Sequence, residues 1–187
     1  MARWLENRDH VGEAMTAPRV RLTGVDEGMH VTVRTRIRGA EDGARVGEAF
    51  AVLFPDAPHV DWPGSPTYPN QQDVTLEVAN VPLDTFLRKL HDQRILDTAL
   101  DAMGSNLEGH TVMFSIERVA ALAGKVTFGL PGHTSLGGVF DVEITGEGVE
   151  DWLLAATHHQ GRAHVPRKLG DERAMDEDGE AVTWFER

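Results

Sequence analysis

The stretch HVTVRTRIR (residues 30–38) decides the fold class, because its apolar and polar side chains alternate along its length. Strict alternation predicts a β-strand with one buried face. The preceding stretch RVRLTGV (19–25) alternates in the same way, and DEGM (26–29) between them supplies turn residues that include Gly28. We therefore expect 19–25 and 30–38 to form a β-hairpin.

This expected hairpin places a set of arginines on one face of the sheet: Arg19, Arg21, Arg34, Arg36 and Arg38. Like charges that lie opposite one another across a strand pair destabilise the sheet, so negative groups should cover them. These negative groups could come from three sources. The first is the same chain, for example the acidic segment 171–180, or simple solvation; the second is an acidic surface of another subunit; the third is nucleic-acid phosphate.

Alternation and composition predict the remaining elements. Further strands are expected at 47–54, 73–81, 110–120, 125–130 and 138–144, and helices at 83–103 and 147–159. Strands and helices do not alternate regularly, which disfavours a doubly wound fold. The expected class is α+β and β-rich, an antiparallel sandwich or barrel of about six to seven strands with two appended helices.

The expected helix 83–103 changes its apolar face partway. Its first half places Leu83, Phe86, Leu87 and Leu90 on one side, and its second half places Leu96, Ala99, Leu100 and Met103 nearly opposite. Either the helix breaks near Asp92, or its second half packs against something other than its own sheet. On the second interpretation, Leu96 and Leu100 belong to an interface.

A chain of 187 residues is long enough for one well-buried domain, and we expect a single domain over 1–187. Within it we expect an N-terminal arm at 1–17, an extended proline-rich loop at 55–72 and a polar, acidic tail at 160–187. The loop carries Trp62 and Tyr68, which either anchor in a neighbouring subunit or fold inward over their own core.

Composition removes several functional classes. The chain has no cysteine, so disulfides, thiolate metal sites and cysteine nucleophiles are absent. It contains no apolar run of membrane-spanning length and no N-terminal secretion signal, and we expect a cytoplasmic or virion location. The formal net charge of −12 repels nucleic acid at long range.

Histidines crowd the stretch THHQGRAHVP (157–166), where His158, His159 and His164 are the candidate metal ligands. Adjacent side chains on a helix diverge by about 100°, whereas two zinc ligands on one helix prefer a spacing of i, i+4. Capping of a helix C-terminus explains these histidines without a metal. We therefore expect no metal and no other cofactor.

Catalytic motifs are also missing. The sequence contains no G-x-S-x-G and no phosphate-binding glycine loop. A carboxylate pair such as Glu117 and Glu143 is expected to lie on solvated strand faces. A small hydrolase or ligand-binding protein is the alternative interpretation, with a pocket formed by carboxylates and the histidines His133, His158, His159 and His164.

The arginine face, the stiffened loop and the helix with two apolar faces together favour a non-enzymatic structural protein. We expect a subunit of a larger assembly that binds other protein subunits, of the kind found among the capsid, connector and tail components of tailed viruses. The expected assembly contacts are Arg19, Arg21, Arg34, Arg36, Arg38, Trp62, Tyr68, Leu96 and Leu100. A binder of anionic polymers that uses the arginine face is the third interpretation.

Overall fold

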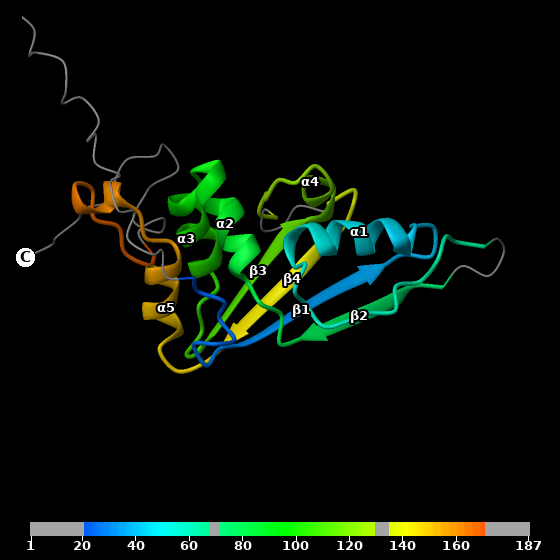
Figure 1. The fold of residues 1–187 in the computed structure, drawn as a ribbon, viewed down its shortest axis with the longest axis horizontal. Coiled ribbons are helices and arrows are strands. Elements are labelled where there is room, and N and C mark those ends of the chain that lie inside the picture. Colours follow the sequence, from blue (N-terminus) through cyan, green and yellow to red (C-terminus); the bar gives the residue numbers. More distant parts are fainter. Residues whose placement is uncertain (1–20, 68–71, 130–134, 171–187) are drawn as a thin grey trace, which may run out of the picture.

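The structure is a computed structural model that describes residues 21–67, 72–129 and 135–170. In this part of the chain, four strands form one antiparallel sheet in the order β2-β1-β4-β3 (Figure 1). The elements are β1 (His30–Ile37), α1 (Gly43–Leu53), β2 (Val74–Ala79), α2 (Asp84–Gln93), α3 (Leu96–Gly104), β3 (Thr111–Glu117), α4 (Arg118–Leu122), β4 (Val139–Thr145), α5 (Val149–Ala156) and a 3-10 helix (Gln160–Ala163). The mixed α+β class is confirmed, whereas a sandwich or barrel of six to seven strands is not found in the described residues.

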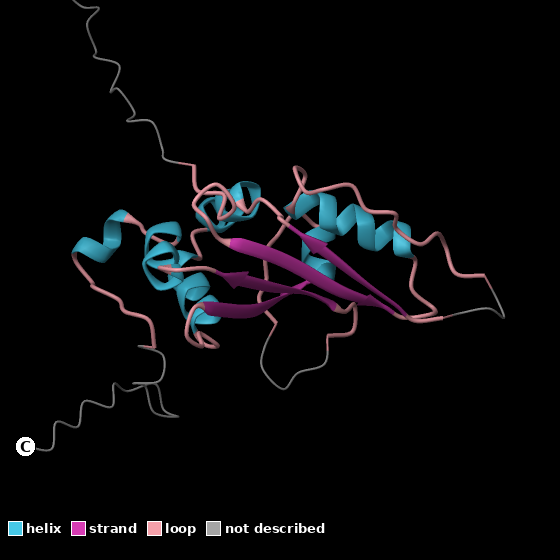
Figure 2. Cartoon of the chain, turned by 90° about the horizontal axis from the view of Figure 1, so that it is seen from below, coloured by secondary structure: helices cyan, strands magenta, loops and turns pink. Residues whose placement is uncertain are grey.

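The helices lie in two groups against the sheet. Figures 1 and 2 show α1 lying along the strands and α2, α3 and α5 gathered at one end. Alternate residues of every strand face the core, and on β1 these are Val31, Val33, Thr35 and Ile37. The other strand positions are mostly polar, with Ala79, Met113 and Val139 as the exceptions, as expected for a sheet face that the described helices do not cover. No described helix has both the length and the apolar character needed to cross a membrane.

The expected hairpin between 19–25 and 30–38 is wrong. Residues 19 and 20 lie outside the described part, and residues 21–25 form no strand. The backbone instead turns at Gly24, whose carbonyl accepts from the N–H of Met29 at 2.8 Å. The neighbours of β1 are β2 and β4, both antiparallel to it. The alternation of β1 was interpreted correctly, but its partners come from distant parts of the chain.

The expected strand at 47–54 is also wrong, because this segment belongs to helix α1. The carboxylate of Asp42 caps the helix by accepting from the N–H of Ala44 at 3.0 Å. Four apolar side chains spaced as on one helix face are buried: Val46, Ala49, Phe50 and Leu53. A short apolar run is compatible with either a strand or a helix. Here the N-cap formed by Asp42 favours the helix.

The expected helix 83–103 is broken as its change of apolar face indicated. Helices α2 and α3 are separated at Arg94, which has a left-handed backbone with φ of 58°. The break allows both halves to bury apolar side chains in one core, which contains Leu90, fully buried, and Leu96, 6% exposed. Leu100 is also fully buried. Leu96 and Leu100 are therefore buried within this chain.

Two other segments differ from expectation. At 125–130 a strand was expected, but the described residues 125–129 contribute only an isolated bridge between Ile116 and Phe128. In the proline-rich loop, Trp62 packs on Phe50 with ring centroids 5.2 Å apart, and it lies so close to Gly47 that a Cβ there would be 2.7 Å from the indole. Trp62 therefore points into its own core, while Tyr68 lies outside the described residues.

One buried ion pair joins the ends of several elements. The guanidinium of Arg118, which is 3% exposed, donates from Nη2 to the two carboxylate oxygens of Glu41 at 2.8 and 2.9 Å. Its Nε donates to the carbonyl of Gly137 at 2.7 Å. A buried charge is tolerated only when it is paired and hydrogen-bonded, so Arg118 fixes the starts of α1, α4 and β4 relative to one another.

Core placement of α3 gives a direct test. Leu100→Ala should lower the free energy of unfolding by about 2–5 kcal/mol, because it leaves a cavity in a fully buried site. Urea denaturation measures this loss. Leu136→Ala is the control, since Leu136 is 99% exposed and its removal should change stability by less than about 0.5 kcal/mol. A Leu100→Ala protein of unchanged stability but altered oligomeric state would show that Leu100 is an interface residue.

Candidate functional site

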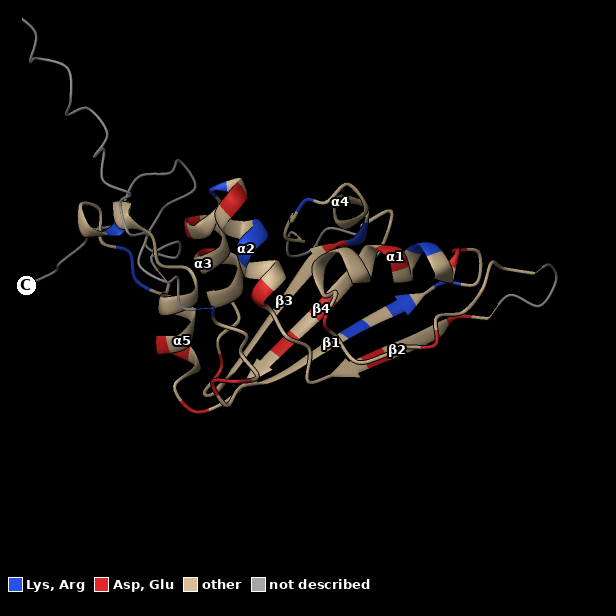
Figure 3. Ribbon diagram, viewed as in Figure 1, with Lys and Arg blue, Asp and Glu red and all other residues tan. Residues whose placement is uncertain are grey.

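The uncovered face of the sheet carries a central arginine that is neutralised by neighbouring strands. Arg34 donates from Nε to Glu77 on β2 at 2.6 Å and from Nη1 to Glu143 on β4 at 2.8 Å. These hydrogen bonds, together with the negative charges, raise the pKa of Arg34. Figure 3 shows the basic segments of β1 between acidic segments of β2 and β4.

The second strand arginine is neutralised in the same way. Arg36 donates to Asp73 at 2.6 Å, and the backbone N–H of Gly39 donates to the same carboxylate at 2.9 Å. These contacts, the Gly39 hydrogen bond first, hold the pKa of Asp73 below its usual value. The expected arginine face is therefore changed: Arg21 lies outside the sheet, Arg38 follows β1, and Arg19 is not among the described residues. The acids that cover Arg34 and Arg36 come from the chain itself.

The histidine stretch forms a polar cluster at the end of α5. Nε2 of His159 lies 3.0 Å from both carboxylate oxygens of Asp97, and the N–H of Gly161 donates to its Nδ1 at 3.2 Å. The proton of this imidazole is therefore assigned to Nε2, and both ring nitrogens are engaged. His158 and His164 are exposed, and His133 lies outside the described part. Across the described residues, no group of three His, Asp or Glu side chains has a metal-binding arrangement.

Asp97 is the residue that both His159 and Arg162 bind in this cluster. Arg162, which is buried, donates from Nη2 to Asp97 at 3.2 Å. Burial acts to raise the pKa of Asp97, but the hydrogen bonds from His159 and Arg162 outweigh it and hold this pKa below its usual value. His158 and His159 both follow the end of α5 at Ala156, so the expectation that they occupy the last turn of that helix is wrong.

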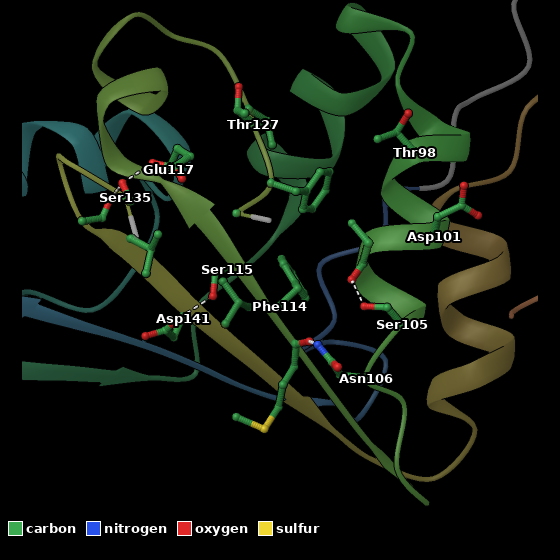
Figure 4. A pocket seen from close by; sticks show the side chains of 18 of the residues that line it. Thr98, Asp101, Ser105, Asn106, Phe114, Ser115, Glu117, Thr127, Ser135 and Asp141 are labelled. Atoms are coloured by element: carbon green, nitrogen blue, oxygen red, sulfur yellow. Dashed lines mark hydrogen bonds between the residues drawn. The ribbon is translucent and has the colours of Figure 1, made fainter. Parts of the chain in front are cut away.

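A groove of about 1480 Å³ lies beside the edge strand β3 (Figure 4). One side is formed by α3, with Thr98, Asp101 and Ser105, and the other by the sheet with Ser115 and Asp141. The apolar lining includes Ile95, Ala102, Met113, Phe114, Val126 and Phe128. The rings of Phe114 and Phe128 meet edge to face with centroids 5.9 Å apart.

The backbone of β3 is partly free where it borders this groove. The side-chain amide of Asn106 donates to the carbonyl of Met113 at 3.2 Å, and the N–H of Gly129 donates to the carbonyl of Ser115 at 2.8 Å. A strand residue directs its N–H and its C=O to the same edge, so the N–H groups of Met113 and Ser115 point outward too. Neither N–H has an acceptor on that edge among the described residues.

Carboxylates line the groove without basic partners. Ser115 donates its hydroxyl proton to Asp141 at 2.6 Å, and Ser135 donates to Glu117. Glu108 is exposed at the rim. In the described structure these three acids, Glu108, Glu117 and Asp141, form no ion pair with Lys or Arg, whereas Asp101 pairs with Arg167 at 2.6 Å. A carboxylate is a weak base at neutral pH, so this arrangement favours binding over serine catalysis.

Sequence reasoning singled out Glu117 and Arg38 but missed the other groove residues. The outward positions of β3 and β4 are visible in the alternation of TVMFSIE (111–117) and VFDVEIT (139–145). The missing information was that β3 is an edge strand, because this depends on pairing between segments far apart in the chain. The suggested pair of Glu117 and Glu143 lies on the uncovered sheet face, where Glu143 is bound to Arg34.

Comparison with known proteins identifies the fold and leaves the function open. By sequence, the chain matches no protein-family model and no curated protein. By structure, it is similar to a UPF0201 protein from Methanococcus jannaschii, with a TM-score of 0.57 and 20% identity, over 71% of this chain and 96% of that one. A second, uncharacterized UPF0201 protein has a TM-score of 0.51 and 23% identity, over 66% of this chain and 89% of that one.

These similarities correct the functional expectation. Both of these solved structures are described as UPF0201 proteins, and neither is described as a capsid, connector or tail protein. The interpretation as a structural subunit of a virion is therefore wrong.

Asp97 gives a pH-dependent prediction. Because its pKa is lower in the folded state than in the unfolded chain, ionised Asp97 stabilises the fold above a pH of about 4, and this contribution is lost as the pH falls further. Asp97→Asn should therefore unfold more easily than the parent protein at pH 7, with a difference that shrinks below pH 4. Thermal unfolding between pH 3 and pH 7 measures it.

The control is Asp56→Asn, which removes an exposed loop carboxylate and should track the parent protein throughout. A stability difference for Asp97→Asn that stays constant down to pH 3 would contradict the account.

Proposed function

We propose that this protein is a recognition module that binds an extended, positively charged polypeptide segment in the groove beside β3. The observation that carries the proposal is the combination of free strand-edge N–H groups with carboxylates that have no basic partner. The bound segment adds to β3 as a short strand, which is an established mode of peptide recognition at exposed sheet edges.

The backbone of β3 supplies the first part of this recognition. The outward N–H groups of Met113 and Ser115 are two residues apart, so they are separated by roughly 7 Å along the strand. Alternate carbonyl groups of an extended chain have the same spacing. The edge is closed on both sides, at one end by the bridge between Glu108 and Thr111 and at the other by Phe128. Between these ends the N–H groups of Met113 and Ser115 are free, while the two carbonyls already accept from Asn106 and Gly129, so the edge accommodates only a short stretch of added strand held mainly by these two N–H groups.

Charge supplies the second part. Glu108, Glu117 and Asp141 surround the groove, and Arg38 is the basic residue that lines it. The net charge of −12 also attracts cations and accelerates their association. A segment with lysine or arginine at alternate positions places its charges near these acids.

Size and apolar character supply the third part. Pockets for small molecules usually have volumes of about 300–1,000 Å³, and this groove is larger and open. Met113, 47% exposed, and the partly buried Phe128 present apolar surface to the groove. Apolar side chains of a bound segment would cover this surface and stabilise the complex by about 25 cal/mol per Å².

The test uses two labelled hexapeptides, one alternating lysine with valine and one alternating glutamate with valine, and fluorescence anisotropy as the readout. The lysine peptide should bind and should dissociate as the salt concentration rises, because exposed ion pairs are screened. The glutamate peptide should show no binding. Equal affinity for both peptides, or no binding of either, would overturn the proposal.

The variant that tests the site is the double substitution Glu117→Gln and Asp141→Asn, which keeps the shape and the serine contacts but removes both charges. We expect the Kd for the lysine peptide to rise by about fivefold to tenfold, since each exposed ion pair contributes about 0.2–1 kcal/mol. The matched control is Glu48→Gln with Asp56→Asn, which removes two exposed charges outside the groove and should leave the Kd nearly unchanged. Equal effects of the two double variants would mean that only net charge matters.

A further inference from the structure

A second, smaller cleft lies between helices α2 and α5 and the segment that precedes β1. Its volume is about 600 Å³, and it shares no lining residue with the β3 groove. The lining residues are Arg21, Leu22, Asp84, Leu87, Arg88, His91, Leu96, Ala155, Ala156 and His158. The volume falls within the range of about 300–1,000 Å³ that is typical of small-molecule sites.

The polar side chains of this cleft are mostly basic. The cleft is lined by Arg21 and Arg88 and also by the imidazoles of His91 and His158. All four side chains are exposed. In the described structure Arg21 has no hydrogen bond or ion pair, which leaves its guanidinium available. Two arginines beside two histidines make this cleft locally basic on a protein whose net charge is −12.

Asp84 is the carboxylate of the cleft and neutralises little of this charge. Its Oδ2 lies 3.3 Å from Nη2 of Arg88, which also donates to the hydroxyl of Thr85 at 2.9 Å. An exposed pair of this kind, four residues apart on one helix, contributes only about 0.3–0.5 kcal/mol. An anion that enters the cleft can therefore recruit Arg88 at small cost.

The interior of the cleft is apolar. Leu87 and Leu96 are 9% and 6% exposed, and Leu22 and Ala156 are partly buried beside them. A bare inorganic anion leaves this surface in contact with water, whereas a ligand with an apolar body covers it. The two features together, a basic rim and an apolar interior, define a ligand with a charged head and an apolar tail.

We infer that the cleft between α2 and α5 binds a small amphipathic organic anion, with its charged head between Arg21 and Arg88 and its apolar body over Leu87 and Leu96. This site is independent of the β3 groove, because it lies elsewhere on the fold and selects the opposite charge. Failure of either proposal leaves the other standing.

The experiment compares three probes by titration calorimetry on the full chain: octyl phosphate below its micelle concentration, inorganic phosphate and octanol. Octyl phosphate should bind at least tenfold more tightly than either of the others, because only this probe uses both the rim and the interior. Octanol binding as tightly as octyl phosphate would overturn the charged part of the inference. Inorganic phosphate binding as tightly as octyl phosphate would overturn the apolar part.

Single substitutions test whether the ligand binds in this cleft. Arg88→Gln and Arg21→Gln should each raise the Kd for octyl phosphate by about tenfold, the loss expected for one charge-assisted hydrogen bond. The matched control is Arg45→Gln, since Arg45 is also an exposed helix arginine that pairs within its own helix, with Glu48 at 3.0 Å. Circular dichroism verifies that each variant is folded. An unchanged Kd in both cleft variants, or an equal change in Arg45→Gln, would contradict the assignment.

Discussion

The alternation of β1 is the constraint on which the rest of the structure depends. Because Val31, Val33, Thr35 and Ile37 enter the core, Arg34 and Arg36 must lie on the uncovered face of the same sheet. There Glu77 of β2, Glu143 of β4 and Asp73, which precedes β2, lie beside them and neutralise their charge. The strand order β2-β1-β4-β3 thus satisfies the core and the charges together, and this face needs no partner to neutralise its arginines.

The arginines on the uncovered face of the sheet are paired with acids of the same chain. Charged side chains without an opposite partner therefore gather at two other places. Negative charge remains beside the outer edge of β3, where Glu108, Glu117 and Asp141 have no basic partner among the described residues. Positive charge remains between α2 and α5 around Arg21 and Arg88. Both places combine charge with apolar surface, and that combination gives a binding site both orientation and affinity. The molecule is therefore better described as a carrier of two recognition sites than as a building block.

Sequence patterns predicted the elements whose signals are local. The alternation of 30–38, 73–81 and 138–144 located β1, β2 and β4, and the change of apolar face located the break between α2 and α3. The patterns failed where the decision is not local. The segment 47–54 is a short apolar run that suits either a strand or a helix, and the false pairing of 19–25 with β1 created an arginine surface that the real neighbours neutralise. The β3 groove was missed because strand order does not follow from the sequence of any one strand.

The proposed binding mode depends on free N–H groups at the outer edge of β3. Amide hydrogen exchange followed by NMR tests most directly whether these groups are free. In the free protein the N–H of Met113 and of Ser115 should exchange quickly, while their core-facing neighbour Phe114, whose N–H points toward β4, should be protected. Addition of the lysine–valine peptide should slow exchange at Met113 and Ser115 and leave β1 unchanged. Strong protection of both groups in the free protein, or no change when the peptide is bound, would contradict the account.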